Sequence, residues 1–127
     1  MTIERDTYTT LSQANTGSTA NQYLTIDLTN STVFEFDVCV TFTNNFNVVS
    51  FRQNSTNKLA ITATDCGLVT DTWSHIKITV DNGTVSLNVD GVDKTTKTLT
   101  DTVNRLYVIL SSGIVFKYKD FLVYPAA

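Results

Sequence analysis

The stretch from residue 73 to residue 92 constrains the fold of this chain more than any other, because it contains two alternating segments joined by a tight-turn sequence. Every second residue of each segment is apolar, which is typical of a strand with one buried face. Asn82-Gly83 supplies the positive φ angles that a two-residue hairpin turn requires, and Asp90-Gly91 repeats this chemistry where the second segment ends. The sequence therefore predicts a β-hairpin whose buried face consists of Ile76, Ile78, Val80, Val85, Leu87 and Val89.

The same alternation recurs along the chain, and no segment holds a helical period of twelve or more residues. Val33–Phe42 carries five large apolar residues on one face and is predicted to be a central strand, while Val92–Thr102 is rich in Thr and Lys and is predicted to be a connection. Nine or ten strands imply an all-β fold of two packed antiparallel sheets, because a single sheet would leave one face bare. Further strands are predicted at Tyr23–Leu28, Val48–Gln53, Lys58–Thr64, and in a final pair, Arg105–Leu110 and Ile114–Tyr124, around Ser111-Ser112-Gly113.

Length and charge narrow the class of protein. The chain has 127 residues, 42% of them hydrophobic and one of them proline, so we expect one domain spanning residues 1–127 with a sizeable core. The formal net charge is −3 and the nine basic residues are scattered, which argues against nucleic acid and acidic membranes as partners. No segment approaches the ~18 apolar residues of a spanning helix, so no membrane insertion is expected.

The location of the protein is left open by its N-terminus, which does not look like a signal peptide. An intracellular protein, a virion component and a module of a larger secreted protein remain alternatives. We expect an extracellular, cell-surface or virion-associated protein whose signal lies outside this chain.

Metal and cofactor chemistry has little support in the sequence. The two cysteines, Cys39 and Cys66, are too few for a disulfide scaffold and lack metal-ligand spacing, and whether they pair is left open. No phosphate-binding or dinucleotide-binding glycine motif is present, so no cofactor is expected. Four aspartates in turns could hold a structural calcium ion, although turn formation explains them equally well. They are Asp65, Asp81, Asp90 and Asp93.

Three segments carry a resemblance to a known superfamily: the strand Phe34–Phe42, the hairpin opened by Trp73, and the closing run Phe116–Pro125, F-K-Y-K-D-F-L-V-Y-P. A tryptophan opening a strand, an apolar alternation and a return strand closing on Asp-Gly resemble the concanavalin-A-like jelly rolls, which include lectins, laminin-G-like modules and glucanases. The resemblance implies a jelly-roll sandwich and favours packing of Trp73 against the core between the sheets. Trp73 could also stack on a sugar ring, so it remains a ligand-binding candidate.

The segment Glu35-Phe36-Asp37-Val38-Cys39 resembles the catalytic strand of laminarinase-type glucanases, except that Cys39 stands where the acid/base glutamate is needed. A retaining glycosidase requires two carboxyl groups about 5 Å apart, one as nucleophile and one as proton donor. His75, the only histidine, is predicted to be an exposed cross-strand residue rather than part of a catalytic triad. We therefore expect no enzymatic activity.

The best candidates for ligand binding are polar and aromatic residues on outward faces and strand ends, because sugars are bound by planar polar groups together with an aromatic platform. The main hypothesis is a non-catalytic carbohydrate-binding module or the receptor-binding part of an adhesin or phage fibre. We expect its glycan binding to be weak and salt-insensitive, with other copies of the chain or a larger parent protein supplying avidity. The alternatives are a structural or protein-interaction module without sugar binding and a degenerate glycosidase. The residues proposed for ligand binding are Arg52, Asn54, Arg105, Tyr107 and Trp73.

Overall fold

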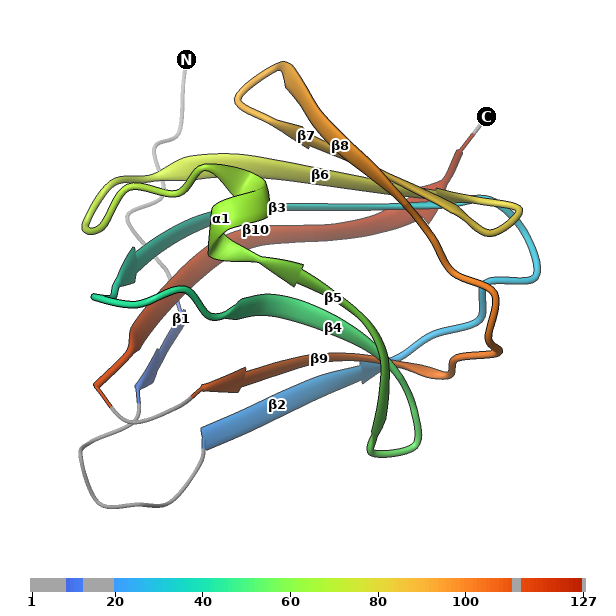
Figure 1. The fold of residues 1–127 in the computed structure, drawn as a ribbon, viewed down its shortest axis with the longest axis horizontal. Helices are drawn as coiled ribbons and strands as arrows, with labels where there is room; N and C mark the ends of the chain where they lie inside the picture. Colours follow the sequence, from blue (N-terminus) through green and yellow to red (C-terminus); the bar gives the residue numbers. More distant parts are fainter. Residues whose placement is uncertain (1–8, 13–19, 111–112, 127) are drawn as a thin grey trace, which may run out of the picture.

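The computed structural model describes residues 9–12, 20–110 and 113–126. Strands in two antiparallel sheets pack face to face, which confirms the predicted all-β sandwich (Figure 1). In spatial order, the six-stranded sheet contains β1 (Thr9–Ser12), β10 (Val115–Pro125), β3 (Thr32–Thr41), β6 (Ser74–Asp81), β7 (Thr84–Val89) and β8 (Val92–Thr98). The four-stranded sheet contains β2 (Ala20–Thr25), β9 (Arg105–Leu110), β4 (Asn47–Gln53) and β5 (Thr56–Thr62).

The hydrophobic core lies between the two sheets. As predicted, β3 is a central strand of the larger sheet, and its apolar face contributes to this core. Register aligns apolar residues of neighbouring strands in rows, since Phe34 pairs with Ile78 and Ile78 with Leu87. The Phe34 ring meets the edge of Phe51 from the opposite sheet, with ring centroids 5.9 Å apart. Eight apolar residues on the faces that the alternation predicted to be buried are at most 4% exposed: Phe34, Phe36, Val38, Val40, Ile76, Ile78, Leu87 and Val89.

The predicted hairpin is confirmed as β6 and β7. Asn82 and Gly83 at its turn have φ angles of 48° and 85°. Asp90 and Gly91 adopt 53° and 83° and form a second tight turn, which leads into β8. The prediction of a connection at Val92–Thr102 is wrong in part, because the first seven residues of this segment form an edge strand. Edge strands tolerate charge and exposure, so β8 shows no apolar alternation that could have revealed it.

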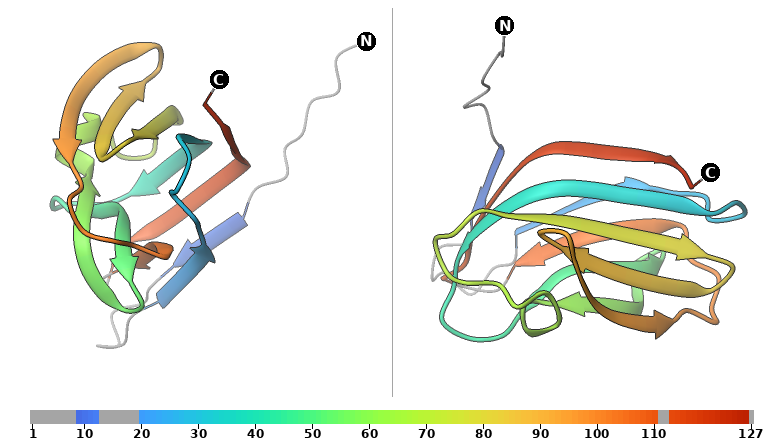
Figure 2. Two further views of the ribbon diagram at one scale, coloured as in Figure 1. Left: turned by 90° about the vertical axis from the view of Figure 1, so that its right-hand side faces the viewer. Right: turned by 90° about the horizontal axis from the view of Figure 1, so that it is seen from above.

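The expected pairing of the last two strands is also wrong. β9 lies between β2 and β4 in the smaller sheet, whereas β10 lies between β1 and β3 in the larger one (Figure 2). Gly113, at φ 85°, belongs to the turn that leads into β10, and residues 111 and 112 of the predicted turn lie outside the described residues. Two strands that are close in sequence thus face each other across the core instead of sharing hydrogen bonds.

One helical turn, α1 (Ala63–Cys66), follows β5 where the strand was expected to continue to residue 64. Thr62 and Asp65 form a capping box, and Gly67 ends the turn at φ 67°. Lys97 of β8 donates hydrogen bonds to the Ala60 carbonyl at 3.1 Å and to Asp65 Oδ2 at 2.7 Å. These contacts join the edge strands of the two sheets. Within the described ranges, no helix is long and apolar enough to cross a membrane.

Candidate functional site

Two arginines and two tyrosines meet on the outer face of the four-stranded sheet. Leu106 and Phe51 point into the core, so strand alternation directs Arg105, Tyr107 and Arg52 outwards. The register places Tyr107 beside Tyr23 of β2, and Arg105 beside Arg52 of β4. We call Tyr23, Arg52, Arg105 and Tyr107 the arginine–tyrosine cluster.

The four side chains of this cluster are interlocked. The rings of Tyr23 and Tyr107 stack with centroids 4.9 Å apart. The Cζ atom of Arg105 lies 4.3 Å from the Tyr23 ring centroid, and that of Arg52 lies 5.3 Å from the Tyr107 centroid. Arg105 Nη1 also donates a hydrogen bond of 3.0 Å to the Tyr107 hydroxyl. Cations over aromatic faces and stacked rings both stabilise this arrangement, so the cluster is held in place before any ligand arrives.

Exposure within the cluster differs from what was expected. Tyr107 was predicted to present its ring to a ligand, yet only 7% of this residue is exposed, because Tyr23 and Arg52 cover it. Tyr23 is 48% exposed and offers the accessible ring. Tyr23 was not among the site residues predicted from the sequence. Its alternation with Leu24 was a signal that it faces outwards, but its position beside Tyr107 depends on long-range strand pairing.

Asn54 lies at the same end of the sheet as Arg52. The Arg52 side chain donates to Ser50 Oγ and to the Ser55 carbonyl, both at 2.8 Å. The Asn54 backbone N–H donates to Asn104 Oδ1 at 2.7 Å, and Asn104 Nδ2 donates to Asn54 Oδ1 at 3.1 Å. Asn104 directly precedes Arg105, so this amide pair forms a polar rim next to the cluster. Four of the five predicted binding residues are thereby brought to one end of one sheet.

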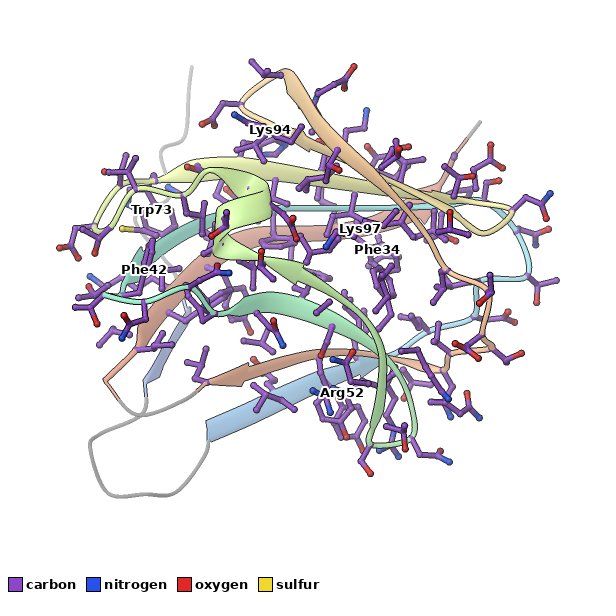
Figure 3. The ribbon with its side chains drawn as sticks, in the orientation of Figure 1. Phe34, Phe42, Arg52, Trp73, Lys94 and Lys97 are labelled. Atoms are coloured by element: carbon purple, nitrogen blue, oxygen red, sulfur yellow. The ribbon has the colours of Figure 1, made fainter. Side chains whose placement is uncertain are left out.

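Trp73, the fifth predicted residue, lies elsewhere. Figure 3 shows it at the opposite end of the long axis from Arg52. The expectation that it packs into the core is wrong, because Trp73 is 39% exposed and Lys119 Nζ lies 4.7 Å from the centroid of its ring. Trp73 precedes β6, whose first residue, Ser74, already points inwards, so alternation turns the tryptophan outwards.

A second polar cluster occupies the six-stranded sheet. His75 Nδ1 lies 2.7 Å from Asp37 Oδ1, and His75 Nε2 lies 2.8 Å from Glu35 Oε1. Tyr124 donates a hydrogen bond to the other oxygen of Glu35. The hydrogen bonds from Tyr124 and His75 lower the pKa of Glu35, while those to Glu35 and Asp37 raise the pKa of His75. His75 is exposed, as predicted, but the sequence did not reveal that it bridges both carboxylates.

This cluster gives the free energy of unfolding a pH dependence. The His75 pKa is raised above 6.5, so its contribution is complete below that value and is lost as pH rises through the folded pKa. The Glu35 pKa is lowered below 4.5, so its contribution is present above that value and is lost as pH falls further. We expect wild type to exceed His75→Gln in stability by less than about 1 kcal/mol, since the side chains are partly exposed.

Urea unfolding of the wild type and of His75→Gln at a series of pH values checks the prediction. The difference should be largest between about pH 4.5 and 6.5 and should shrink towards pH 8. A difference that grows with rising pH would contradict the assigned direction of the His75 shift.

The four aspartates considered for calcium each have a protein partner in this structure. Asp65 pairs with Lys97, Asp81 accepts a hydrogen bond from Ser31, and Asp90 accepts one from the His75 backbone N–H. Asp93 accepts one from Asn88. In the described part of the chain, no three His, Cys, Asp or Glu side chains are grouped so that they could hold a metal ion.

The two cysteines are free thiols in this structure. Cys66 is buried beside Asp65, and burial raises the pKa of its thiol to about 12. Cys66 is therefore inert as a nucleophile near neutral pH.

An apolar cavity of about 220 Å³ opens between the sheets, next to β2 and β10. Its lining includes Leu24, Phe36 and Phe121. Tyr118 donates a hydrogen bond of 2.7 Å to Gln22 Oε1, and both residues also line the cavity. The Phe121 ring stacks on Phe36 with centroids 5.4 Å apart, which narrows the space on the β10 side.

No family model and no curated protein matches this chain. Solved structures do match its fold. A chain described as a sialidase superposes with a TM-score of 0.74 over 93% of this chain, at 9% identity. The binding domain of botulinum neurotoxin DC in complex with SialylT gives 0.60 over 92% at 10% identity. A structure of botulinum neurotoxin type C, whose cell entry is described as dependent upon interaction with two ganglioside molecules, gives 0.62 over 92% at 8% identity.

These similarities are similarities of fold. This chain spans 15% of the sialidase chain and 38% and 39% of the two neurotoxin chains. The shared architecture is a β-sandwich of jelly-roll type, in agreement with the fold predicted from the sequence. Because the identities are so low, the fold alone is established by this comparison.

Proposed function

We propose that this chain is a non-catalytic glycan-binding module and that it binds sugars through the arginine–tyrosine cluster. The observation that carries the proposal is the exposed Tyr23 ring, which contacts both Tyr107 and Arg105 on the outer face of one sheet. A sugar ring stacks its apolar face on an aromatic ring, and its hydroxyl groups accept hydrogen bonds from planar polar groups. Here those planar groups are the two guanidinium groups and the amides of Asn54 and Asn104.

The interlocked contacts of the cluster favour binding because they reduce the entropy that a ligand would otherwise have to remove. Arg52 is already held by Ser50 and Ser55, and Arg105 by Tyr107. A preorganised surface loses less side-chain freedom on binding than a mobile one. The site is nevertheless shallow, so each copy is expected to bind with a Kd of roughly millimolar to micromolar strength, and display in several copies would supply useful avidity.

The structural comparisons support glycan binding, but they do not indicate which residues of this chain bind a glycan. One similar structure is of a binding domain in complex with SialylT, and another concerns a toxin that interacts with gangliosides. We propose membership of the concanavalin-A-like superfamily and a place outside the cell, on a cell surface or on a virion. Other copies of the chain or a larger parent protein would provide the multivalency.

The absence of catalysis is proposed from the arrangement of Glu35 and Asp37. Both carboxylates contact the one imidazole of His75, and Glu35 also accepts a hydrogen bond from Tyr124. The lowered pKa of Glu35 keeps this group ionised near neutral pH, whereas an acid catalyst needs a raised pKa. Cys39, on the same face, supplies no proton donor of the required kind.

A glycan array probed with a multimer of the chain tests the proposal. We expect binding to a subset of glycans. Tyr23→Ala should reduce this binding by about tenfold or more, because the contact between the sugar and the aromatic ring contributes more than about 1 kcal/mol. Trp73→Ala is the matched control, because it removes an exposed aromatic ring at the other end of the molecule and should leave binding unchanged.

Three results would overturn parts of the proposal. Binding lost in Trp73→Ala and retained in Tyr23→Ala would move the site to the other end of the sandwich. No glycan signal from a folded multimer would favour a structural or protein-interaction module. Release of reducing sugar from a bound glycan, lost in Glu35→Gln, would show that the protein is a glycosidase.

A further inference from the structure

We infer that the glycan recognised by the arginine–tyrosine cluster carries a negative charge, as a carboxylate or a sulfate group on the sugar. This inference rests on the proposed function and names the chemical class of the ligand. Its basis is the distribution of charge over the two sheets and the direct pairing of two arginines.

The four-stranded sheet carries only positive charge in a protein that is acidic as a whole. The chain has twelve acidic and nine basic residues, yet none of the acidic residues lies in β2, β4, β5 or β9. These four strands contain Arg52, Lys58 and Arg105. Glu35 and Asp37, by contrast, lie in β3 of the other sheet. The folded chain thus separates its charges, and the cluster lies on the positive sheet.

The two arginines are unfavourable neighbours unless an anion joins them. Arg52 and Arg105 are directly opposite partners on β4 and β9, and like charges at such positions destabilise a sheet. Among the described residues, the ion pairs join His75 to Glu35 and Asp37, and Lys97 to Asp65, so neither arginine has a carboxylate partner. An anion bound beside both guanidinium groups would remove this repulsion.

Hydrogen-bonding capacity also remains for such an anion. A guanidinium group has five N–H donors in a planar fork that fits carboxylate and sulfate oxygens. Arg52 uses Nε and Nη1 for Ser50 and Ser55, and Arg105 uses Nη1 for Tyr107. The Nη2 group of each arginine makes no hydrogen bond within the described structure. An acidic sugar bound against the exposed part of Tyr23 would bring its charged group towards Arg105, whose Cζ lies 4.3 Å from that ring centroid.

The expected salt dependence changes accordingly. The few charges and the acidic balance of the sequence led us to expect salt-insensitive binding, but strand pairing brings two of the three arginines together. Because exposed charges are screened by salt, binding should weaken when the salt concentration rises from about 0.05 M to about 0.5 M.

The test compares three forms of one oligosaccharide that differ in a single group: neutral, carboxylated and sulfated. Binding of each to the multimeric chain is titrated at both salt concentrations. We expect at least one acidic form to bind about tenfold or more tightly than the neutral form, which corresponds to one charge-assisted interaction. The carboxylated and sulfated arms show which anion the site prefers.

Arginine variants connect this preference to the cluster. Arg105→Gln should abolish the difference between acidic and neutral forms, whereas Arg105→Lys, which keeps the charge without the fork, should retain part of it. Lys77→Gln is the control, because it removes the same charge from an exposed position on the six-stranded sheet. Circular dichroism and thermal unfolding establish that each variant is folded before binding is measured.

The outcomes separate the inference from the proposed function. Equal binding of neutral and acidic forms would overturn the inference and leave glycan binding intact. An equal loss of acid preference in Lys77→Gln and Arg105→Gln would also overturn it, because net charge rather than the cluster would then be responsible. Failure of all three forms and of the wider array to bind would overturn both.

Discussion

Replacing Phe34 with alanine should lower the free energy of unfolding by about 3–5 kcal/mol, the loss expected for a large aromatic side chain removed from a packed core. Phe34 is fully buried at the centre of β3. Its ring contacts Phe51 across the interface, and its strand neighbour is Ile78, so side chains of both sheets would border the cavity. The surrounding backbone belongs to paired strands and cannot collapse far into the space.

Urea unfolding followed by circular dichroism measures this loss. Phe121→Ala is the matched control, because it deletes the same atoms from a residue that is 36% exposed and lies within the irregular pairing of β10. Its cost should be smaller, roughly 1–2 kcal/mol, and should come mainly from the lost stacking on Phe36. Equal losses in the two variants would mean that the two sheets do not pack around Phe34 as described.

Gly83→Ala should destabilise the protein by about 2–3 kcal/mol, which is large for the addition of one methyl group at a surface turn. Gly83 has a φ angle of 85°, a conformation that side-chain-bearing residues rarely adopt. An added Cβ would also lie 3.1 Å from the Leu99 carbonyl oxygen. The Leu99 backbone N–H donates a 2.8 Å hydrogen bond to the Gly83 carbonyl, so this neighbour is not free to move away.

Gly91→Ala separates the cost of the positive φ angle from the cost of the contact with the Leu99 carbonyl oxygen. Gly91 has nearly the same φ angle, 83°, but an added Cβ would meet no atom within 4 Å. We expect this variant to lose only about 1 kcal/mol, the cost of the left-handed backbone alone. Thermal unfolding of both variants provides the comparison, and a Gly91 variant as unstable as the Gly83 variant would refute the proposed contact with Leu99.

Local sequence chemistry determined most of the strands and their buried faces. Alternation requires only neighbouring residues, so it identified the inward faces of β3, β6 and β7 correctly, and Asn82-Gly83 specified the hairpin turn. The same local signal failed at β8, because an edge strand with exposed faces has no alternation to detect. The expected core position of Trp73 was implied by the family resemblance instead, and it was wrong because Trp73 directly precedes the inward-facing Ser74 of β6.

The candidate site was predicted only in part, because alternation along one strand does not show which strands are neighbours. Alternation placed Arg52, Arg105 and Tyr107 outwards, but their contact depends on β4, β9 and β2 lying side by side. Those strands are far apart in sequence, and their register decides that Arg105 meets Arg52 and that Tyr23 covers Tyr107. The sequence by itself determined which face each side chain takes, because that follows from a period of two along one strand. Only the tertiary structure decided which side chains meet, because strand order and register are set by the packing of the whole core.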